Sequence, residues 1–401
     1  MGEKVIEKEV HTQPLEIVAF GNQTREDRRL LKKFVDFHWD HYRNDPQYIP
    51  LLDYEYLGFK LLGIHGFFEP DSLFLRHAEM RFFLAYQDGK PVARCNAFVN
   101  YNHNKHWKDK VGFFGQFESI DNVEVCRTLL NTAGTWLRER GMEVMRGPQN
   151  LPVNEATPGV LTEGFDSRPV IYYHYNKPYY EKLLLESGFQ PVKRVRSWEV
   201  LVHTPMEEKL DRLAERIIQR YGITIEPWGK RPLEIRKKEM LEVYNSAWSD
   251  NFGFVPFEPE EFYQIIDDMQ LIMQKDLFIF VYVKGELAAF LGAVPNIAET
   301  LKPIPGLRRA ELLRALKMLL GKNRTKGLRL GYLGVKKKFR GLGLDGVMLW
   351  YQKKYVQQHR KQYTYCDVGW VLEDNIRTIR MVDYMNAVPS KTYTIFEKKI
   401  I

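Results

Sequence analysis

Residues 328–372 constrain the fold more than any other part of this chain. An apolar run at 330–335 is followed by a basic, glycine-rich turn at 336–345, a helical pattern at 346–361 and a β-rich run at 363–372. Glycines let the backbone bend sharply and approach a ligand closely, and a helix N-terminus directs free N–H groups and the positive end of its dipole at that ligand. The order strand, glycine turn, helix, strand therefore predicts an anion-binding unit.

The length and the cysteines limit the class of protein. A chain of 401 residues is too long for one ordinary core and predicts two domains. The chain has no apolar run of the roughly 18 residues that span a bilayer, and its charged N-terminus lacks the apolar core of a signal peptide. Cys95, Cys126 and Cys366 are far apart and odd in number, so they predict neither a disulfide framework nor a zinc site. We therefore expect a protein of the reducing cytoplasm.

The positive charge is concentrated in one segment. The whole chain carries a net charge of +8. Between 307 and 329, eight basic residues stand against the single acid Glu311, so this segment holds nearly the whole excess. Nucleic-acid binding, in contrast, needs basic residues over a broad face. We therefore expect no specific nucleic-acid partner.

Predicted elements occur in the same order in both halves of the chain. In the first half the strands lie at 15–20, 81–86, 91–99, 111–120, 142–146 and 192–202, and the helices at 25–43, 121–140 and 178–187. In the second half the strands lie at 223–227, 277–283, 286–293, 330–335, 363–372 and 392–397, and the helices at 236–249, 258–273, 346–361 and 374–386. The repetition predicts an α+β fold with similar domains at 1–204 and 223–401, a helical linker at 205–222 and a basic helical insertion at 297–328.

Residues 335–345 resemble the acyl-CoA-binding motif of the GNAT acyltransferase superfamily, Gln/Arg-x-x-Gly-x-Gly/Ala. Arg340, Gly343 and Asp345 fall on its three fixed positions. Asp345 departs from the expected Gly or Ala. It either places a carboxylate near the phosphates or serves in the first turn of the helix with its side chain turned outward. The stretch 369–375 is similar to the fifth strand and the start of the fourth helix of the family.

The resemblance implies two tandem GNAT-like domains, each with a mixed central sheet flanked by helices. The chain is similar in both motifs to an uncharacterised group of bacterial tandem-GNAT proteins, some of which are associated with long-chain N-acylation. The implied activity is acyl transfer from acyl-CoA, a co-substrate, to an amine, with no metal. The first half lacks the phosphate loop, because residues 117–121 pass into a helix without glycines and carry two acids. We expect this half to bind no CoA and to shape the acceptor site.

The implied acyl-CoA site uses both backbone and side chains. Backbone N–H groups of 339–346 would hold the pyrophosphate, Lys336 to Lys338 and Arg340 would neutralise phosphate charge, and the strand at 331–335 would run along the pantetheine arm. The predicted cofactor-binding residues are Leu333, Val335, Lys336, Phe339, Arg340, Gly341, Leu342, Gly343, Leu344, Asp345, Gly346 and Asn375. The alternative is a solvated basic turn without a ligand.

The acid that the superfamily often uses is missing. In its pattern Asn-x-x-x-x-x-Leu-Tyr, Asn375 matches the Asn, but Met381 and Val382 replace Leu-Tyr. Tyr384 lies about 200° further around a helix, so it does not simply substitute. The candidate bases are Asp367 and Glu373, and the candidate acids are Tyr332 and Tyr365. Each has an ordinary structural alternative, and an enzyme of this type can also act by positioning, with water relaying protons.

Two stretches bear on the acceptor. The aromatic stretch 248–257, with Trp248, Asn251, Phe252 and Phe254 as candidate substrate-binding residues, favours an apolar partner or caps the core. Residues 307–320 form a basic amphipathic pattern, which predicts a helix that lies on an anionic membrane or an ordinary surface helix that buries its leucines. If both functional interpretations hold, the acceptor is a lipid amine such as a sphingoid base. The protein would then lie in the cytoplasm, peripheral to the inner membrane face.

Two alternative functions stay open. The first is a non-catalytic acyl-CoA- or lipid-binding protein, which the missing tyrosine and Asp345 favour. The second is a Fem-type aminoacyl-tRNA-dependent transferase, against which the glycine loop argues.

Two histidine pairs have the spacing of half of a metal site, namely His38 with His41 and His103 with His106. Neither pair has an evident third ligand, so we expect ordinary surface histidines.

Overall fold

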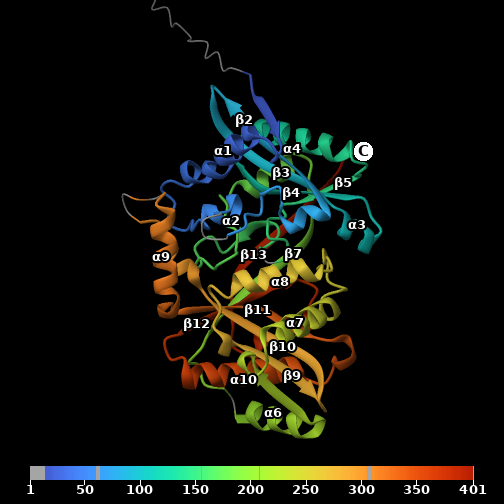
Figure 1. Ribbon diagram of the computed structural model, residues 1–401, viewed down its shortest axis with the longest axis vertical. Coiled ribbons are helices and arrows are strands. Elements are labelled where there is room, and N and C mark those ends of the chain that lie inside the picture. Colours follow the sequence, from blue (N-terminus) through green and yellow to red (C-terminus); the bar gives the residue numbers. More distant parts are fainter. Residues whose placement is uncertain are drawn as a thin grey trace, which may run out of the picture.

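The computed structural model describes residues 14–400, except 60–63, 155, 207, 305–306 and 308. Its described strands join in one mixed sheet that runs through the molecule, with helices packed around it (Figure 1). The strands follow in the order β1-β2-β3-β4-β5-β13-β7-β12-β11-β10-β9-β8, and β6 pairs with β13 at the side. The prediction of an α+β fold with a mixed sheet and flanking helices is confirmed.

Strands and helices alternate along both halves of the chain. The strands are β1 Glu16–Phe20, β2 Ala78–Gln87, β3 Lys90–Asn100, β4 Val111–Ser119, β5 Val144–Gly147, β6 Val160–Glu163, β7 Gln190–Leu201, β8 Ile223–Pro227, β9 Phe278–Val283, β10 Glu286–Pro295, β11 Gly327–Val335, β12 Tyr365–Leu372 and β13 Val388–Lys399. The helices are α1 Arg25–His41, α2 Asp53–Leu57, α3 Tyr101–Trp107, α4 Val123–Arg138, α5 Tyr180–Glu186, α6 Glu208–Tyr221, α7 Leu233–Ala247, α8 Pro259–Met269, α9 Glu311–Gly321, α10 Leu344–His359 and α11 Ile376–Asp383.

Both hairpins predicted from the sequence form. Asp88 and Gly89 join β2 to β3, and Lys284 and Gly285 join β9 to β10. All four residues have positive φ, which is the backbone conformation that a two-residue hairpin turn requires. The turn chemistry therefore fixes these pairs locally, without help from the rest of the fold.

The two halves exchange strands where they meet. β13, at the end of the chain, lies between β5 and β7 of the first half, and β7 in turn pairs with β12 of the second half. In Figure 1, β13 and β7 run together between the blue-to-green half above and the yellow-to-red half below. The domain boundaries drawn from the sequence stay a prediction, and the sheet continues across them.

The second half carries helices on both faces of its strands. Gly334 of β11 faces Trp248 at the end of α7, whereas Leu330 lies with Leu349 of α10 on the opposite face. A large apolar core surrounds β9 to β12, and two smaller cores lie in the first half. No helix in the described part of the chain combines the length and apolarity needed to cross a membrane. These layers leave β11 and β12 free to diverge at one end.

Candidate functional site

A wedge opens between β11 and β12. The two strands pair in parallel from Gly327 to Leu330, and then they diverge, because β12 continues its pairing with β7 instead. Gly331 is an extra residue between the partners of Gly292 and Ala293 in β10, so a β-bulge bends β11 at this point. From 331 to 335 the edge of β11 that faces the wedge has no partner strand among the described residues.

The glycine turn lies at the end of that open edge. Gly341 and Gly343 have φ of 89° and 79°, a conformation that favours glycine, and Gly343 is the residue before the first turn of α10. Within the described chain, no acceptor takes the backbone N–H groups of 341–345. These donors point from a turn and a helix N-terminus, which is the arrangement that binds phosphate.

The basic side chains of the turn are held by acids. Lys337 pairs with Asp250 at 2.7 Å, and Lys338 pairs with Glu286 at 2.6 Å. Arg340 donates to the carbonyl of Ala247 at 2.8 Å. A further pair joins Lys336 to Glu242. Most of these side chains are strongly exposed, and exposed pairs contribute only about 0–1 kcal/mol each, so a phosphate can replace the acids at small cost.

Asp345 directs its side chain at α11 rather than outward, so neither of its two predicted arrangements describes it fully. It lies in the first turn of α10, and its carboxylate pairs with Arg377 of α11 at 2.7 and 3.2 Å. The carboxylate also accepts the N–H of Gly346 at 3.1 Å. Because Arg377 neutralises it, the Asp345 charge repels a nearby phosphate less than the sequence alone suggests.

The wedge between β11 and β12 contains a cavity of about 140 Å³. It brings together side chains predicted for the cofactor and for the acceptor, namely Leu333, Asn375, Tyr332, Trp248, Asn251, Phe252 and Phe254. The first half supplies another wall, including Phe113, Arg146 and Gln149. The cavity is therefore built by both halves of the chain, and its described lining has no acidic side chain.

A larger cavity of about 1020 Å³ lies beyond the glycine turn, between α6, α10 and α11. Gly343, Asp345 and Gly346 are on its wall. The predicted linker helix, α6, supplies an apolar face and basic side chains, among them Leu210, Leu213, Ile217, Lys209, Arg212 and Arg216. The sequence predicts α6 only as a linker, although its apolar residues at helical spacing could have marked it as a cavity wall.

A third, apolar cavity of about 50 Å³ lies under α10. It shares Leu330 and Val368 with the wedge cavity, and it shares Lys353 and Met385 with the large cavity. Leu349 lines all three. The three cavities therefore adjoin one another beneath α10, with mostly apolar side chains as their shared walls.

Asp367 lies in a buried polar group beside the wedge. It is 2% exposed and pairs along the parallel ladder with Arg329, which lines the wedge cavity. Burial raises the pKa of the Asp367 carboxyl to about 6, and the charges of Lys391 and Arg329 oppose that rise. Tyr173 and Ser197 are hydroxyl neighbours that lie outside standard hydrogen-bond geometry. Sequence reasoning missed Arg329, although a lone arginine inside an apolar strand could have marked it.

Two other candidate catalytic residues lie near the wedge. Tyr332 lines the cavity, and its hydroxyl contacts Sδ of Met269 at 3.6 Å. Glu373, at the end of β12, accepts the backbone N–H of Arg194 at 3.0 Å. Tyr332 therefore faces the wedge cavity, whereas Glu373 holds β7 against β12, and their chemical roles stay predictions.

Tyr365 lies away from the wedge. Its ring stands against Gly327, at the end of β11 where the two strands are still paired. Its hydroxyl donates to Glu299 at 2.7 Å and accepts from Asn296 at 3.0 Å. The structure does not bring this tyrosine to the place where β11 and β12 diverge.

The corresponding wedge of the first half is filled by the chain itself. β4 and β5 pair in parallel over three residues and then diverge, as β11 and β12 do. The N–H of Gln149 donates to Phe114 O at 2.6 Å, and the N–H of Gln116 donates to Asn150 Oδ1 at 2.8 Å. A Cβ on Gly115 would lie 2.0 Å from Gln149 O, so this segment sits directly on the edge of β4.

The expectation of surface histidines is wrong for two of the four. His38 contacts Asp53 at 3.3 Å and His103 contacts Asp109 at 3.5 Å, and both histidines are buried. Burial lowers the pKa of His38 to about 4 and that of His103 to about 3, so both imidazoles are uncharged at neutral pH. The described residues contain no group of three or more side chains that suits a metal.

The chain is similar to two known proteins over most of its length. It is 26% identical over 380 residues to Protein YghO of Escherichia coli (strain K12), which covers 92% of this chain and 93% of that protein. It is also 26% identical over 334 residues to Bacterial ceramide synthase of Caulobacter vibrioides (strain NA1000 / CB15N), with 82% of this chain and 85% of that protein covered. No family model matches the chain.

Solved structures agree on the fold. A tandem GNAT protein from the clavulanic acid biosynthesis pathway superposes with a TM-score of 0.54 at 11% identity, over 97% of this chain and 99% of that one. A GCN5-related N-acetyltransferase from Sphaerobacter thermophilus superposes with a TM-score of 0.50 at 11% identity, over 96% of each chain. At this identity the likeness concerns the backbone alone, and the chain has the fold of the tandem GNAT proteins.

Proposed function

We propose that this chain is an acyltransferase that moves an acyl group from a CoA thioester to an amine. The observation that carries the proposal is the open edge of β11, which leads to a row of free backbone N–H groups at the glycine turn. An extended, amide-bearing arm suits the first part, and a diphosphate suits the second. Coenzyme A has both in this order.

The donor would lie across the wedge with its diphosphate on the N–H groups of 341–345. Lys337, Lys338 and Arg340 would leave their present acidic partners for the phosphates, and Arg377 would contribute from α11. The pantetheine arm would pair with the edge of 331–335. The thioester would then reach the wedge cavity, where the acceptor residues Trp248 and Phe252 stand.

Acyl transfer needs a neutral amine, a polarised carbonyl and a proton for the departing thiolate. The C–N bond forms as the C–S bond breaks, the amine loses one proton, and the thiolate gains one. We assign the proton acceptor to Asp367, which lies beside the cavity-lining Arg329 on the neighbouring strand, because its pKa near 6 leaves it ionised at neutral pH. Tyr332 is the candidate donor, since it lines the cavity. The guanidinium groups of Arg329 and Arg146 disfavour a second cation, so they favour the neutral amine.

The acyl chain and the acceptor would both be apolar. The cavity under α10 shares the side chains of Leu330 and Val368 with the wedge cavity, and a long acyl tail would pass between these side chains from the thioester. The acceptor walls are aromatic, with Phe252 and Phe254 among them. Similarity to a protein named as a ceramide synthase supports a lipid amine. We place the reaction in the cytoplasm.

A second candidate function is acyl-CoA binding without turnover. It is favoured by Val382, which is buried where the superfamily often has its tyrosine, and by the exposure of Tyr384, which lies in the large cavity instead. An aminoacyl-tRNA-dependent reaction is less favoured, because the N–H donors at the glycine turn suit a diphosphate. RNA binding would also need basic residues over a broad face, whereas the excess positive charge of this sequence is concentrated at 307–329.

Thiol release from acetyl-CoA and palmitoyl-CoA in the presence of a panel of amines tests the proposal. Gly343→Trp should abolish both release and acyl-CoA binding, because the side chain would fill the diphosphate site. Gly229→Trp is the matched control, since a Cβ there meets nothing within 4 Å and Gly229 is exposed. Binding by calorimetry without release would favour the second function. Sensitivity to ribonuclease would favour the tRNA-dependent one.

A further inference from the structure

Helix α9 exposes its leucines. Among the described residues of α9, only Arg314 and Met318 are buried. The leucines are exposed between 42% and 69%, namely Leu312, Leu313, Leu316, Leu319 and Leu320, and Leu307 just before the helix is 52% exposed. The expected alternative, a surface helix that buries its leucines, is therefore wrong.

The leucines form one stripe. At about 100° per residue, the five leucines of α9 fall within an arc of roughly 120° around the helix axis. Arg314 and Met318 lie on the opposite side. Lys317 borders the stripe and is exposed. The helix is amphipathic in the inverted sense, with an arginine toward the protein and leucines toward the outside.

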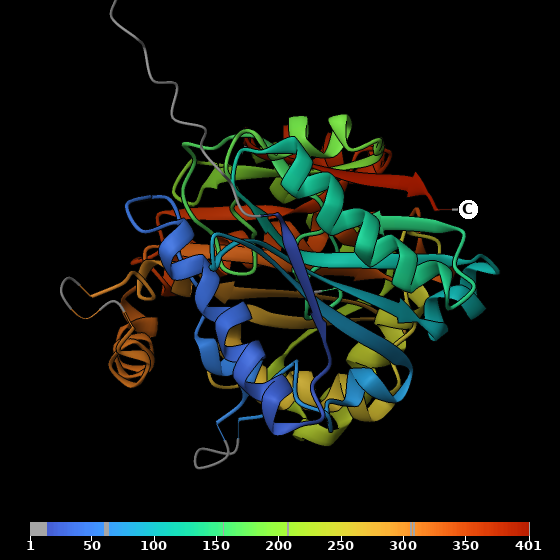
Figure 2. The same ribbon diagram turned by 90° about the horizontal axis from the view of Figure 1, so that it is seen from above.

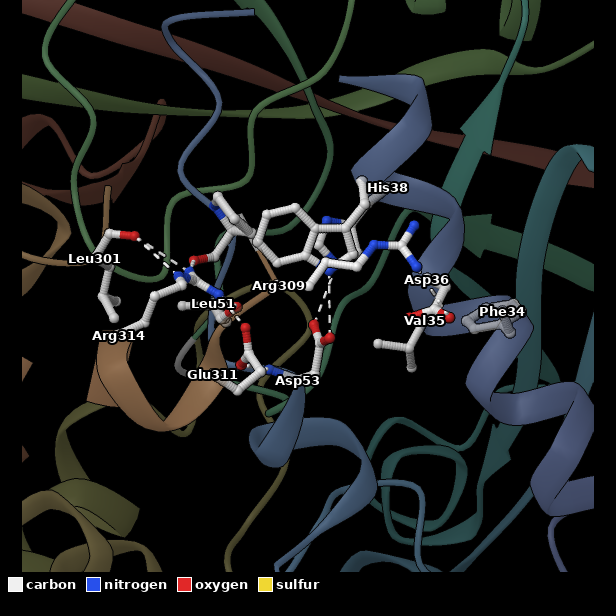
Figure 3. Close-up of polar contacts among 12 residues, drawn as sticks. Phe34, Val35, Asp36, His38, Leu51, Asp53, Leu301, Arg309, Glu311 and Arg314 are labelled. Atoms are coloured by element: carbon white, nitrogen blue, oxygen red, sulfur yellow. Dashed lines mark hydrogen bonds and ion pairs between the residues drawn. The ribbon is translucent and has the colours of Figure 1, made fainter. Parts of the chain in front are cut away.

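A buried guanidinium fixes this orientation. Arg314 is fully buried and donates to three backbone carbonyls, those of Pro50, Leu51 and Leu301. It also pairs with Glu311, which in turn accepts the N–H of Asp53 at 2.7 Å (Figure 3). A rotation that buried the leucines would strand the guanidinium without acceptors, so the outward stripe is a built feature of the fold.

The helix stands at the outer edge of the molecule. Figures 1 and 2 both show α9 at the side, beyond the strands and away from α3 and α7. Arg309, just before it, is exposed and lies 3.6 Å from Asp36 of α1. The basic border of the stripe is Arg309 and Lys317 with the other exposed basic residues of the same segment, Lys302, Arg324 and Lys326, and Lys317 donates to the carbonyl of Lys302 at 3.2 Å. The only acid in the sequence from 301 to 326, Glu311, is held by Arg314.

We propose that the α9 face, defined as the six leucines above with their basic border, docks on an anionic lipid bilayer. Leucines would enter the boundary between headgroups and acyl chains, and the basic border would meet anionic headgroups. A second copy of the chain fits less well, because it would bring two sets of like charges together. The positive charge of the border therefore favours an anionic bilayer over a second copy of the chain.

Docking through α9 leaves the CoA side in water. Glu299, close to α9 in the chain, accepts from Gly327, the first residue of β11, whereas the glycine turn follows the other end of that strand. The water-soluble donor would thus approach from the solution while the opposite end of the sheet rests on lipid. The proposal does not depend on acyl transfer, and its test needs no turnover.

Vesicle co-sedimentation of the full chain tests the proposal, with phosphatidylcholine vesicles that contain or lack phosphatidylglycerol. The double variant Leu316→Glu/Leu320→Glu should bind anionic vesicles at least about tenfold more weakly than wild type. The matched control is Leu185→Glu/Leu201→Glu, which adds the same charge at exposed leucines in other elements. Wild type should bind neutral vesicles much less than anionic ones.

Three results would overturn the proposal. The first is equal binding of the α9 variant and the control variant. The second is equal binding to neutral and anionic vesicles. The third is a dimer in light scattering that the α9 variant breaks, which would assign the α9 face to a contact between copies. Circular dichroism of both variants checks that each is folded.

Discussion

Replacing Asp367 by Asn should make the protein more stable and less active at neutral pH. The carboxyl is buried beside Arg329, and its neighbours do not fully offset the loss of water. Asn has the size of a protonated aspartate and carries no charge, so it mimics the form of Asp367 that burial favours. The two effects, on stability and on activity, have opposite signs.

The magnitude follows from the pKa. In the folded protein the pKa of Asp367 is about 6, against an ordinary value of 3.8. The native state binds this proton more tightly than the unfolded state, so the stabilisation is present below pH 3.8 and is lost as pH rises through 6. Because the folded pKa is higher than the ordinary pKa by about two, ionisation of Asp367 at neutral pH destabilises the folded state by about 3 kcal/mol. Lys391, whose pKa burial lowers to about 8, loses a partner in the variant, so we expect a net gain of about 1–3 kcal/mol.

Urea unfolding at several pH values measures this effect. The stability gain of Asp367→Asn should be about 1–3 kcal/mol near neutral pH and should vanish at about pH 4. If Asp367 accepts the amine proton, kcat should fall by about 10²–10⁴, and the rise of wild-type kcat/KM through pH 6 should be absent from the variant. A variant that is less stable than wild type at neutral pH, or a gain that does not change with pH, would refute the reasoning.

Three further changes test other parts of the structure. Gly343→Ala places a Cβ 3.0 Å from Ile217 at a φ of 79°, so it should cost about 1 kcal/mol of stability and weaken acyl-CoA binding in calorimetry. Arg314→Met removes a fully buried guanidinium and leaves the half-buried Glu311 without its ion-pair partner, so urea unfolding should show a loss of about 3–5 kcal/mol, whereas a neutral result would remove the anchor of α9. Leu330→Trp enlarges a side chain on the wall between the wedge cavity and the cavity under α10, so turnover should fall more with palmitoyl-CoA than with acetyl-CoA, and equal losses would contradict the proposed place of the acyl tail.

The sequence predicted the local parts of the site well. The glycine turn and the helix after it are confirmed, although α10 begins at Leu344, two residues earlier than expected, because Gly343 takes the position before the first turn. Both hairpins also follow from their turn residues alone. Such features depend on backbone geometry within a few residues, which the sequence states directly.

Features that depend on distant contacts were not predicted. The pairing of β13 with β5 joins two segments from different halves of the chain, and nothing in either strand specifies it. In α9 the periodicity identified which residues share a side, but not which side is buried. The carbonyls of Pro50, Leu51 and Leu301 decide that question, and they belong to segments far apart in the sequence.

The difference between the two wedges has one structural cause. Gln149 bonds to the edge of β4 and so closes the wedge of the first half, and it also lines the wedge cavity of the second half. The segment around it would have to leave β4 before an extended ligand could pair there, and the second cavity would then lose a wall. One segment, around Gln149, therefore both occupies the edge of β4 and forms a wall of the wedge cavity of the second half. This shared segment couples the two wedges, and the placement of β13 between β5 and β7 joins the two halves in one continuous sheet.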